Sequence, residues 1–105
     1  MASDTIVVHL YAKEGKEVED KIRAKLLEAS DSFCKDEGTL GWFVMQDKKD
    51  SRAWCIVERY AGESSLKIHV ANPFYKKFGA FIGPLLAKPT DMRWFSEIPR
   101  PAAKL

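Results

Sequence analysis

The chain has 105 residues, of which 46% are hydrophobic and 30% are charged, and its 17 basic residues nearly balance 15 acidic ones. This length suits one small domain, and the composition is that of a globular protein. The charges are scattered without a basic block, so we expect no binding to nucleic acid. No apolar run reaches the ~18 residues that a membrane-spanning helix needs, so we expect no insertion into a membrane.

The N-terminal half predicts a strand, a helix and a β-hairpin. Residues 5–12 are rich in β-branched and aromatic side chains, which is typical of a strand. Residues 40–46 and 53–60 predict two more strands, joined by a polar hairpin loop. Between the first strand and the second, over residues 16–35, apolar side chains recur every three or four positions, which predicts an amphipathic helix. Its buried face would be formed by Val18, Ile22, Leu26, Ala29 and Phe33.

The next segment predicts a helix in two pieces. A short helical segment is expected from about residue 64 to residue 71. Asn72 and Pro73 then supply an N-cap and a proline in the first turn of a second piece. Gly83-Pro84 should end or kink that piece. Its apolar stripe would consist of Phe74, Phe78, Phe81 and Leu85.

The last predicted strand covers residues 92–98 and is stopped by Pro99 and Pro101. The order of elements is therefore β-α-β-β-α-β, which is the arrangement of ferredoxin-like α+β folds. This topology places the helices on one face of an antiparallel sheet. We expect one domain over residues 1–98 and a flexible tail over residues 99–105.

The predicted sheet has a second face that also needs a cover. Side-chain alternation sets Ile6, Val8 and Leu10 opposite to Val7, His9 and Tyr11 on the first strand. On the third strand it sets Trp54, Ile56, Glu58 and Tyr60 opposite to Cys55, Val57 and Arg59. Neither face is purely polar, and a monomer would leave one mostly apolar face in water. We therefore expect a homodimer in which two such faces meet, since two-fold symmetry is the commonest in proteins.

The two cysteines, Cys34 and Cys55, are expected late in a helix and inside a strand. Without a Cys-x-x-Cys motif or a Cys/His cluster, we expect reduced, partly buried thiols and no metal site. The N-terminus has no charged leader before an apolar stretch, which favours a cytoplasmic location over secretion. The chain ends in Ala103-Lys104-Leu105, which resembles the peroxisomal signal Ser-Lys-Leu, so import into peroxisomes is the alternative.

Five short motifs follow one another along the chain: Glu37-Gly38-Thr39-Leu40-Gly41-Trp42, Gln46-Asp47, Val57-Glu58-Arg59-Tyr60, His69-Val70-Ala71-Asn72-Pro73 followed by Phe78, and Pro84-Leu85-Leu86-Ala87. Together they resemble the antibiotic biosynthesis monooxygenase (ABM) domain family over residues 5–98. The resemblance implies a dimeric α+β barrel with a pocket between helices and sheet in each subunit. It also implies oxidation or hydroxylation of a small aromatic, quinol-like or lipophilic substrate by O2, without a bound cofactor.

The resemblance also implies site residues. His69 is the candidate base, because the pKa of histidine lies near neutral pH. Tyr60 is expected either to donate a hydrogen bond to a substrate oxygen or to pack in the core. Glu58 and Arg59 are interpreted as cross-strand charge pairing at least as much as chemistry. The substrate-binding candidates are Val8, Trp42, Trp54, Asn72, Phe74 and Phe78.

Two positions depart from the family pattern. Phe74 stands where many members have a second histidine, and Ile56 stands where the polyketide-hydroxylating members have an asparagine. These departures leave two other functions open. One is a non-catalytic, stress-responsive dimeric barrel that binds a hydrophobic small molecule, and the other is an isomerase that uses the same pocket for enolisation.

Overall fold

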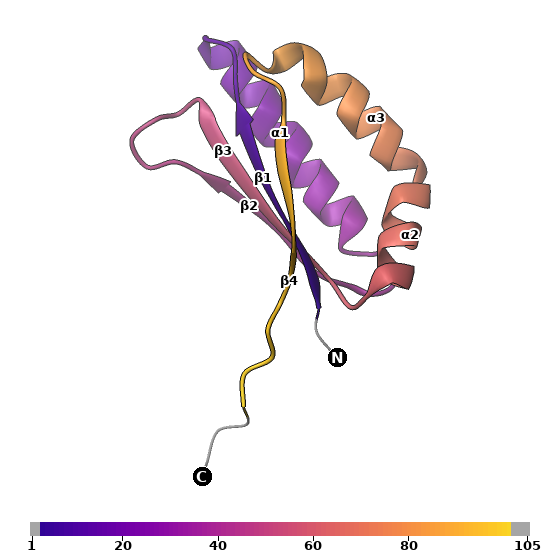
Figure 1. The fold of residues 1–105 in the computed structure, drawn as a ribbon. Helices are drawn as coiled ribbons and strands as arrows, with labels where there is room; N and C mark the ends of the chain where they lie inside the picture. Colours follow the sequence, from indigo (N-terminus) through magenta and orange to yellow (C-terminus); the bar gives the residue numbers. More distant parts are fainter. Residues whose placement is uncertain (1–2, 102–105) are drawn as a thin grey trace.

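A computed structural model describes residues 3–101 and shows a four-stranded antiparallel sheet with all its helices on one face (Figure 1). The arrangement is the predicted ferredoxin-like α+β fold. The elements are β1 (Asp4–Tyr11), α1 (Lys16–Phe33), β2 (Thr39–Gln46), β3 (Ala53–Tyr60), α2 (Glu63–Ala71), α3 (Pro73–Ile82), a short 3-10 helix (Gly83–Leu85) and β4 (Asp91–Ser96).

The strand order β2-β3-β1-β4 places the first and third strands in the middle of the sheet. Its register aligns side chains in rows across the strands. Trp42 of β2 pairs with Glu58 of β3, Glu58 pairs with Ile6 of β1, and Ile6 pairs with Trp94 of β4. This row lies on the face that the helices cover. Glu58 is its acidic member, and the other three side chains are hydrophobic or aromatic.

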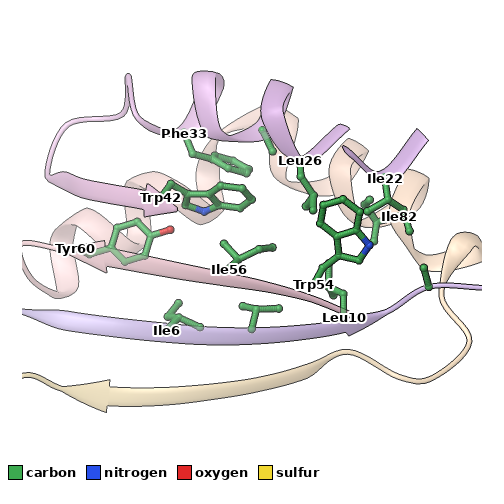
Figure 2. Packing of buried hydrophobic residues seen from close by; sticks show 13 residues of the cluster. Ile6, Leu10, Ile22, Leu26, Phe33, Trp42, Trp54, Ile56, Tyr60 and Ile82 are labelled. Atoms are coloured by element: carbon green, nitrogen blue, oxygen red, sulfur yellow. The ribbon is translucent and has the colours of Figure 1, made fainter. Parts of the chain in front are cut away.

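The core lies between this inner face and α1 (Figure 2). Burial of apolar side chains is the main stabilising contribution to such a fold. The predicted stripe of α1 is confirmed, since Val18 packs against the core and the other four residues are buried. The buried hydrophobic residues are Ile6, Val8, Leu10, Ala12, Ile22, Leu26, Ala29, Phe33, Trp42, Trp54, Ile56, Tyr60 and Ile82.

The break between α2 and α3 follows from Asn72 and Pro73, as predicted. Asn72 has an extended backbone, and its side chain accepts a 2.9 Å hydrogen bond from the backbone N–H of Phe74. The predicted stripe of α3 is wrong at Phe81, which is 41% exposed. The apolar side chains that face the core instead recur every four residues, and the buried position after Phe78 is Ile82.

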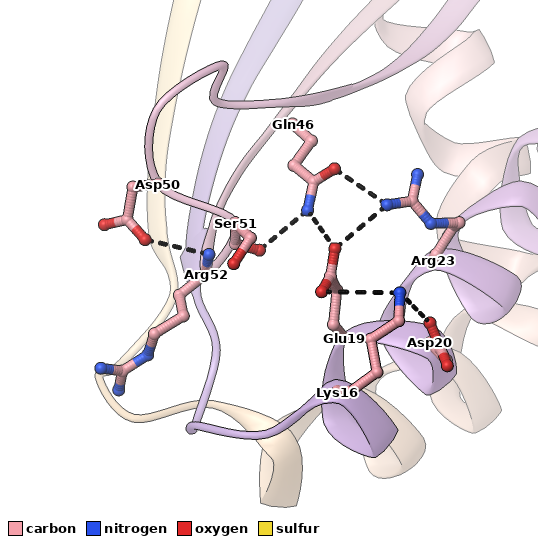
Figure 3. A network of polar contacts seen from close by, with 8 residues as sticks. All are labelled: Lys16, Glu19, Asp20, Arg23, Gln46, Asp50, Ser51 and Arg52. Atoms are coloured by element: carbon pink, nitrogen blue, oxygen red, sulfur yellow. Dashed lines mark hydrogen bonds and ion pairs between the residues drawn. The ribbon is translucent and has the colours of Figure 1, made fainter.

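A polar network joins the start of α1 to the β2–β3 hairpin (Figure 3). The Gln46 Nε2 atom donates to Glu19 Oε2 and to the Ser51 carbonyl, each at 2.9 Å, and Arg23 donates to Gln46 Oε1 at 2.9 Å. The Gln46 hydrogen bond lowers the pKa of Glu19. Surface pairs of this kind contribute little to the free energy of folding. The network therefore positions the hairpin but adds little to the stability of the fold.

The end of β4 is tied back to the sheet. The strand ends at Ser96, two residues before its predicted end, but the Glu97 N–H still donates to the Ser3 carbonyl at 2.8 Å. The Glu97 carboxylate accepts hydrogen bonds from Arg59 at 2.8 and 2.9 Å. The predicted domain boundary near residue 98 stays a prediction. The peroxisome-like motif of Ala103-Lys104-Leu105 lies outside the described residues.

Cys34 was expected to be partly buried, and this is wrong. It follows the last residue of α1 and is exposed, because it lies beyond the turn that packs on the sheet. Cys55 is half-buried on the outer face of β3, and burial raises the pKa of its thiol. Within residues 3–101, no helix has the length and apolar character needed to cross a membrane.

Candidate functional site

A cavity of about 240 Å³ lies between the inner face of the sheet and helices α2 and α3. Most of its wall is apolar, with Ile6 and Val8 from β1 on one side and Phe78 from α3 on the other. Met92 and Trp94 of β4 also line it, and they are 43% and 60% exposed, so the cavity is open along this strand. Ligand pockets commonly enclose about 300–1,000 Å³, so this cavity suits a small ligand.

Glu58 and Tyr60 form the polar end of this cavity. The two-residue period of a strand places both side chains on the inner face of β3. Tyr60 is fully buried, and its hydroxyl donates a 2.6 Å hydrogen bond to Glu58 Oε1. Glu58 lines the cavity, whereas Tyr60 lies behind it. Tyr60 can therefore act on a ligand only through the carboxylate.

His69 of α2 lies beside the same carboxylate. Its Nε2 atom is 3.5 Å from Glu58 Oε1, and its Nδ1 atom is buried without a hydrogen-bond partner. A buried N–H without an acceptor is costly, so we assign the imidazole proton to Nε2, the ring nitrogen that lies 3.5 Å from Glu58. The ring is enclosed by Phe33, Tyr60 and Tyr75, whose centroids lie 4.4, 5.0 and 5.2 Å away.

Burial sets the charge states of these three groups. It raises the pKa of Glu58, an effect that hydrogen bonding from Tyr60 and Trp42 opposes. It lowers the pKa of His69, which the charge of Asp36 partly offsets, so the imidazole is neutral at pH 7. Burial, and then the Glu58 charge, raises the pKa of Tyr60 above its usual value of 10. The site thus places a carboxylate of raised pKa beside a neutral tyrosine hydroxyl and a neutral imidazole.

Trp42 completes the polar end from β2. Its indole ring packs against Phe33 and Phe78 at centroid distances of 5.4 and 5.9 Å. Figure 2 shows the indole nitrogen on the side of the ring that faces the sheet. This N–H makes no hydrogen bond of ordinary length and angle, yet it is close enough to Glu58 to lower the pKa of that carboxyl. It is therefore a weaker donor to the carboxylate than Tyr60.

The structure brings together four of the eight residues predicted for the site. Val8, Trp42, His69 and Phe78 all line the cavity. Tyr60 does not line the cavity, but its hydroxyl donates a hydrogen bond to Glu58, which does. Across residues 3–101, no group of three or more His, Cys, Asp or Glu side chains is arranged to hold a metal ion. The wall of the cavity is suited to an organic ligand.

The other three predicted residues lie away from the cavity. Trp54 is at the opposite end of the core from Trp42 (Figure 2), where the Arg23 guanidinium lies 5.2 Å from its ring centroid. Asn72 is used by the helix cap and by hydrogen bonds of 3.0 and 3.1 Å to the Asp36 carboxylate. Phe74 packs edge-on against Phe33. None of the three lines the cavity, so their predicted contact with substrate has no support from this geometry.

Glu58 lines the cavity, although it was not among the residues predicted for the site. Cross-strand charge pairing was the other explanation for Glu58 and Arg59. Arg59 does pair with Glu97 on the outer face, whereas Glu58 points to the inner face and lies beside His69. A signal was available in the sequence. Alternation places Glu58 in one row with Ile56 and Tyr60, and an acidic residue on a face destined for burial is rarely structural alone.

The ABM family model, described as antibiotic biosynthesis monooxygenase, matches residues 5–80 of the sequence, which is well over half of its length. The chain belongs to this family. The match includes β1, α1, β2, β3 and α2 and most of α3, so it contains Glu58, Tyr60 and His69. A search of curated proteins gives no significant match.

Solved structures share the ABM fold with this chain at low sequence identity. Rv0793 from Mycobacterium tuberculosis has a TM-score of 0.83 at 16% identity, over 95% of this chain and 99% of its own. PA3566 from Pseudomonas aeruginosa has a TM-score of 0.83 at 16% identity, over 94% and 97%. A variant of SnoaB from Streptomyces nogalater, described as a cofactor-independent oxygenase, has a TM-score of 0.80 at 8% identity, over 93% and 95%.

Proposed function

We propose that this ABM protein is a monooxygenase that uses O2, without a bound cofactor, to oxidise a small aromatic, quinol-like or lipophilic substrate. The observation that carries the proposal is the buried Glu58 carboxylate at the end of an apolar cavity, hydrogen-bonded by Tyr60 at 2.6 Å and 3.5 Å from His69 Nε2. Membership of the ABM family supports it, as does the likeness in fold to a cofactor-independent oxygenase.

The chemistry needs a proton acceptor in a dry site. Removal of a proton from an electron-rich substrate gives an anion that passes an electron to O2 more readily than the neutral compound does. A hydroquinone would then become a hydroxyquinone. The ring loses four electrons, one oxygen atom enters it, and the other leaves as water, so no further reductant is needed. The apolar wall supports this step because electrostatic interactions are stronger where water is excluded.

We also propose that the protein works as a homodimer through the sheet face opposite the helices. Figure 1 shows that no helix of residues 3–101 covers this face. Phe43, Met45 and Phe95 project from it and are 51%, 43% and 51% exposed, and Val7 and Val57 lie between them in the central strands. Apolar patches of this kind usually mark a protein interface, and a second copy offers the same surface.

The oxygenase proposal is tested by oxygen uptake with a panel of hydroquinones and anthrones, with and without a metal chelator. We expect uptake that survives chelation and a product that carries one atom from ¹⁸O2 in its mass. His69→Ala should lower kcat at least about tenfold, because the Glu58 carboxylate loses the imidazole that lies 3.5 Å from it inside the site. The matched control is Trp54→Phe, which lies away from the cavity and should leave kcat within about twofold. Absence of uptake with every compound would overturn the proposal and favour a binding role.

A further inference from the structure

The charges around the cavity are one-sided. Of the residues that the structure places on its wall, Glu58 is the only acidic one, and none is a lysine or an arginine. The other polar side chains of the wall include the hydroxyl groups of Thr90 and Tyr75 and the imidazole of His69, which burial keeps neutral. A ligand that enters the cavity therefore meets one negative charge and no positive charge to balance its own.

The Glu58 carboxylate also has one oxygen, Oε2, that accepts no hydrogen bond of ordinary length and angle from residues 3–101. Tyr60 and His69 both approach Oε1, at 2.6 and 3.5 Å. Oε2 is then the atom that can accept a hydrogen bond from a ligand in the cavity. In the tautomer assigned above, Nε2 carries the proton and Nδ1 is buried among aromatic rings, so Glu58 rather than His69 accepts a proton from a ligand. His69 therefore acts as a positioning residue for the carboxylate.

From these two observations we propose that the cavity selects an uncharged ligand with a hydroxyl group on an aromatic or enolic carbon, and that Glu58 makes this selection. Glu58 Oε2 accepts the hydroxyl hydrogen bond and then the proton itself. The O–H bond breaks, its electron pair stays on the ligand oxygen, and the negative charge moves from Glu58 to the ligand. Carboxylates and phosphates of the same size are turned away, because their charge would lie beside that of Glu58.

This inference deepens the proposed function and rests on it for the later step with O2, but its first step can be tested without oxygen. Three naphthalenes of similar size serve as probes. 2-Naphthol is neutral and has the hydroxyl, 2-methoxynaphthalene is neutral and lacks it, and 2-naphthoate carries a charge. Their dissociation constants are measured under argon at pH 7.5, from quenching of tryptophan fluorescence or by calorimetry.

For the wild-type protein we expect 2-naphthol to bind at least about tenfold more tightly than either other probe. In Glu58→Gln, the affinity for 2-naphthoate should rise at least about tenfold, because the repelling charge is gone. Glu63→Gln is the matched control: it removes one negative charge from the exposed surface of α2 and should leave all three constants within about twofold.

The outcomes separate this inference from the oxygenase proposal. The expected pattern of affinities without any oxygen uptake in air would support the role of Glu58 and overturn the oxygenase. Equal binding of 2-naphthol and 2-naphthoate by the wild-type protein would overturn the role of Glu58, whatever the enzyme does with O2. Failure of all three probes to bind would overturn it as well. The wild-type comparison decides even if Glu58→Gln does not fold.

Discussion

Tyr60 donates a 2.6 Å hydrogen bond to Glu58, its neighbour two residues back on the same face of β3. Both side chains are buried, so the bond lies where the local dielectric is low and the loss of either partner is felt strongly. It also links the two parts of the site. Glu58 faces the cavity, and Tyr60 holds it from behind. The pair thus explains how a carboxylate can be kept in an apolar layer.

Tyr60→Phe should raise the pKa of Glu58 further. Burial already raises this pKa, and the Tyr60 hydroxyl is the larger of the two hydrogen-bonding effects that oppose the rise. The measurement is a pH titration of the Glu58 carboxyl followed by ¹³C NMR. Tyr75→Phe is the control, because that ring lines the cavity without a hydrogen bond to Glu58, and it should leave the titration in place. An unchanged midpoint in Tyr60→Phe would contradict this account of the site.

Glu58→Gln should stabilise the fold at high pH. The folded-state pKa of Glu58 lies above its ordinary value, so its contribution to stability is full below the unfolded-state pKa and is lost as the pH rises through the folded-state pKa. Glutamine resembles the protonated acid at every pH. The variant should therefore match the wild-type Tm near pH 4 and exceed it near pH 8. Equal differences in Tm at both pH values would show that Glu58 is not buried as a charge.

Sequence patterns predicted the fold well because they are local. Asn72 and Pro73 break the second helix by capping and by a missing N–H, and alternation along β3 assigns each side chain to a face whatever the rest of the chain does. The site depends instead on where the helices leave a cavity over the inner face of the sheet. Trp42 and Trp54 are both inner-face tryptophans, and only the packing of α1 and α3 places one at the cavity and the other beneath α1.

The same limit explains why Tyr60 was among the predicted site residues and Glu58 was not. The same motif contains both residues, but cross-strand charge pairing was an equally good explanation for Glu58 and Arg59. The structure separates them by face: Arg59 bonds to Glu97, a residue 38 positions away that no local pattern connects to β3. Contacts of such long sequence separation are set by the strand order, which the sequence alone does not reveal in enough detail.

Gly38→Ala should lower the free energy of unfolding by more than about 2 kcal/mol. Gly38 has a φ of 85°, which is unfavourable for other residues, and a Cβ there would lie 1.9 Å from Ser65 Oγ. Ser65→Gly in the same chain should restore part of the loss by removing the clash. Gly79→Ala is the control within α3, where a Cβ meets nothing within 4 Å, and it should stabilise by about 0.5–1 kcal/mol. Chemical denaturation of the wild type and the three variants gives the four free energies of unfolding.

Glu97→Gln should remove part of the acid sensitivity of the fold. Hydrogen bonds from Arg59 and then from Thr5 lower the pKa of Glu97 to about 2. Since this pKa is below the ordinary 4.5, its contribution is present above pH 4.5 and is lost as the pH falls toward 2. The wild-type protein should lose stability in this window, and the variant should lose less. Glu63→Gln is the surface control, and an equal effect from it would remove the special role of Glu97.

Val57→Lys should convert the proposed dimer into monomers. Val57 lies in the middle of the uncovered sheet face, paired with Val7 on one side and Phe43 on the other, so a charge there would be buried without a partner when two faces meet. Leu27→Lys is the matched control, because Leu27 is 57% exposed on α1, away from this face. Sedimentation equilibrium at micromolar concentration should give twice 11.9 kDa for the wild type and for Leu27→Lys, and 11.9 kDa for Val57→Lys. A wild-type protein that sediments only at 11.9 kDa would refute the dimer and would leave the apolar face needing another cover.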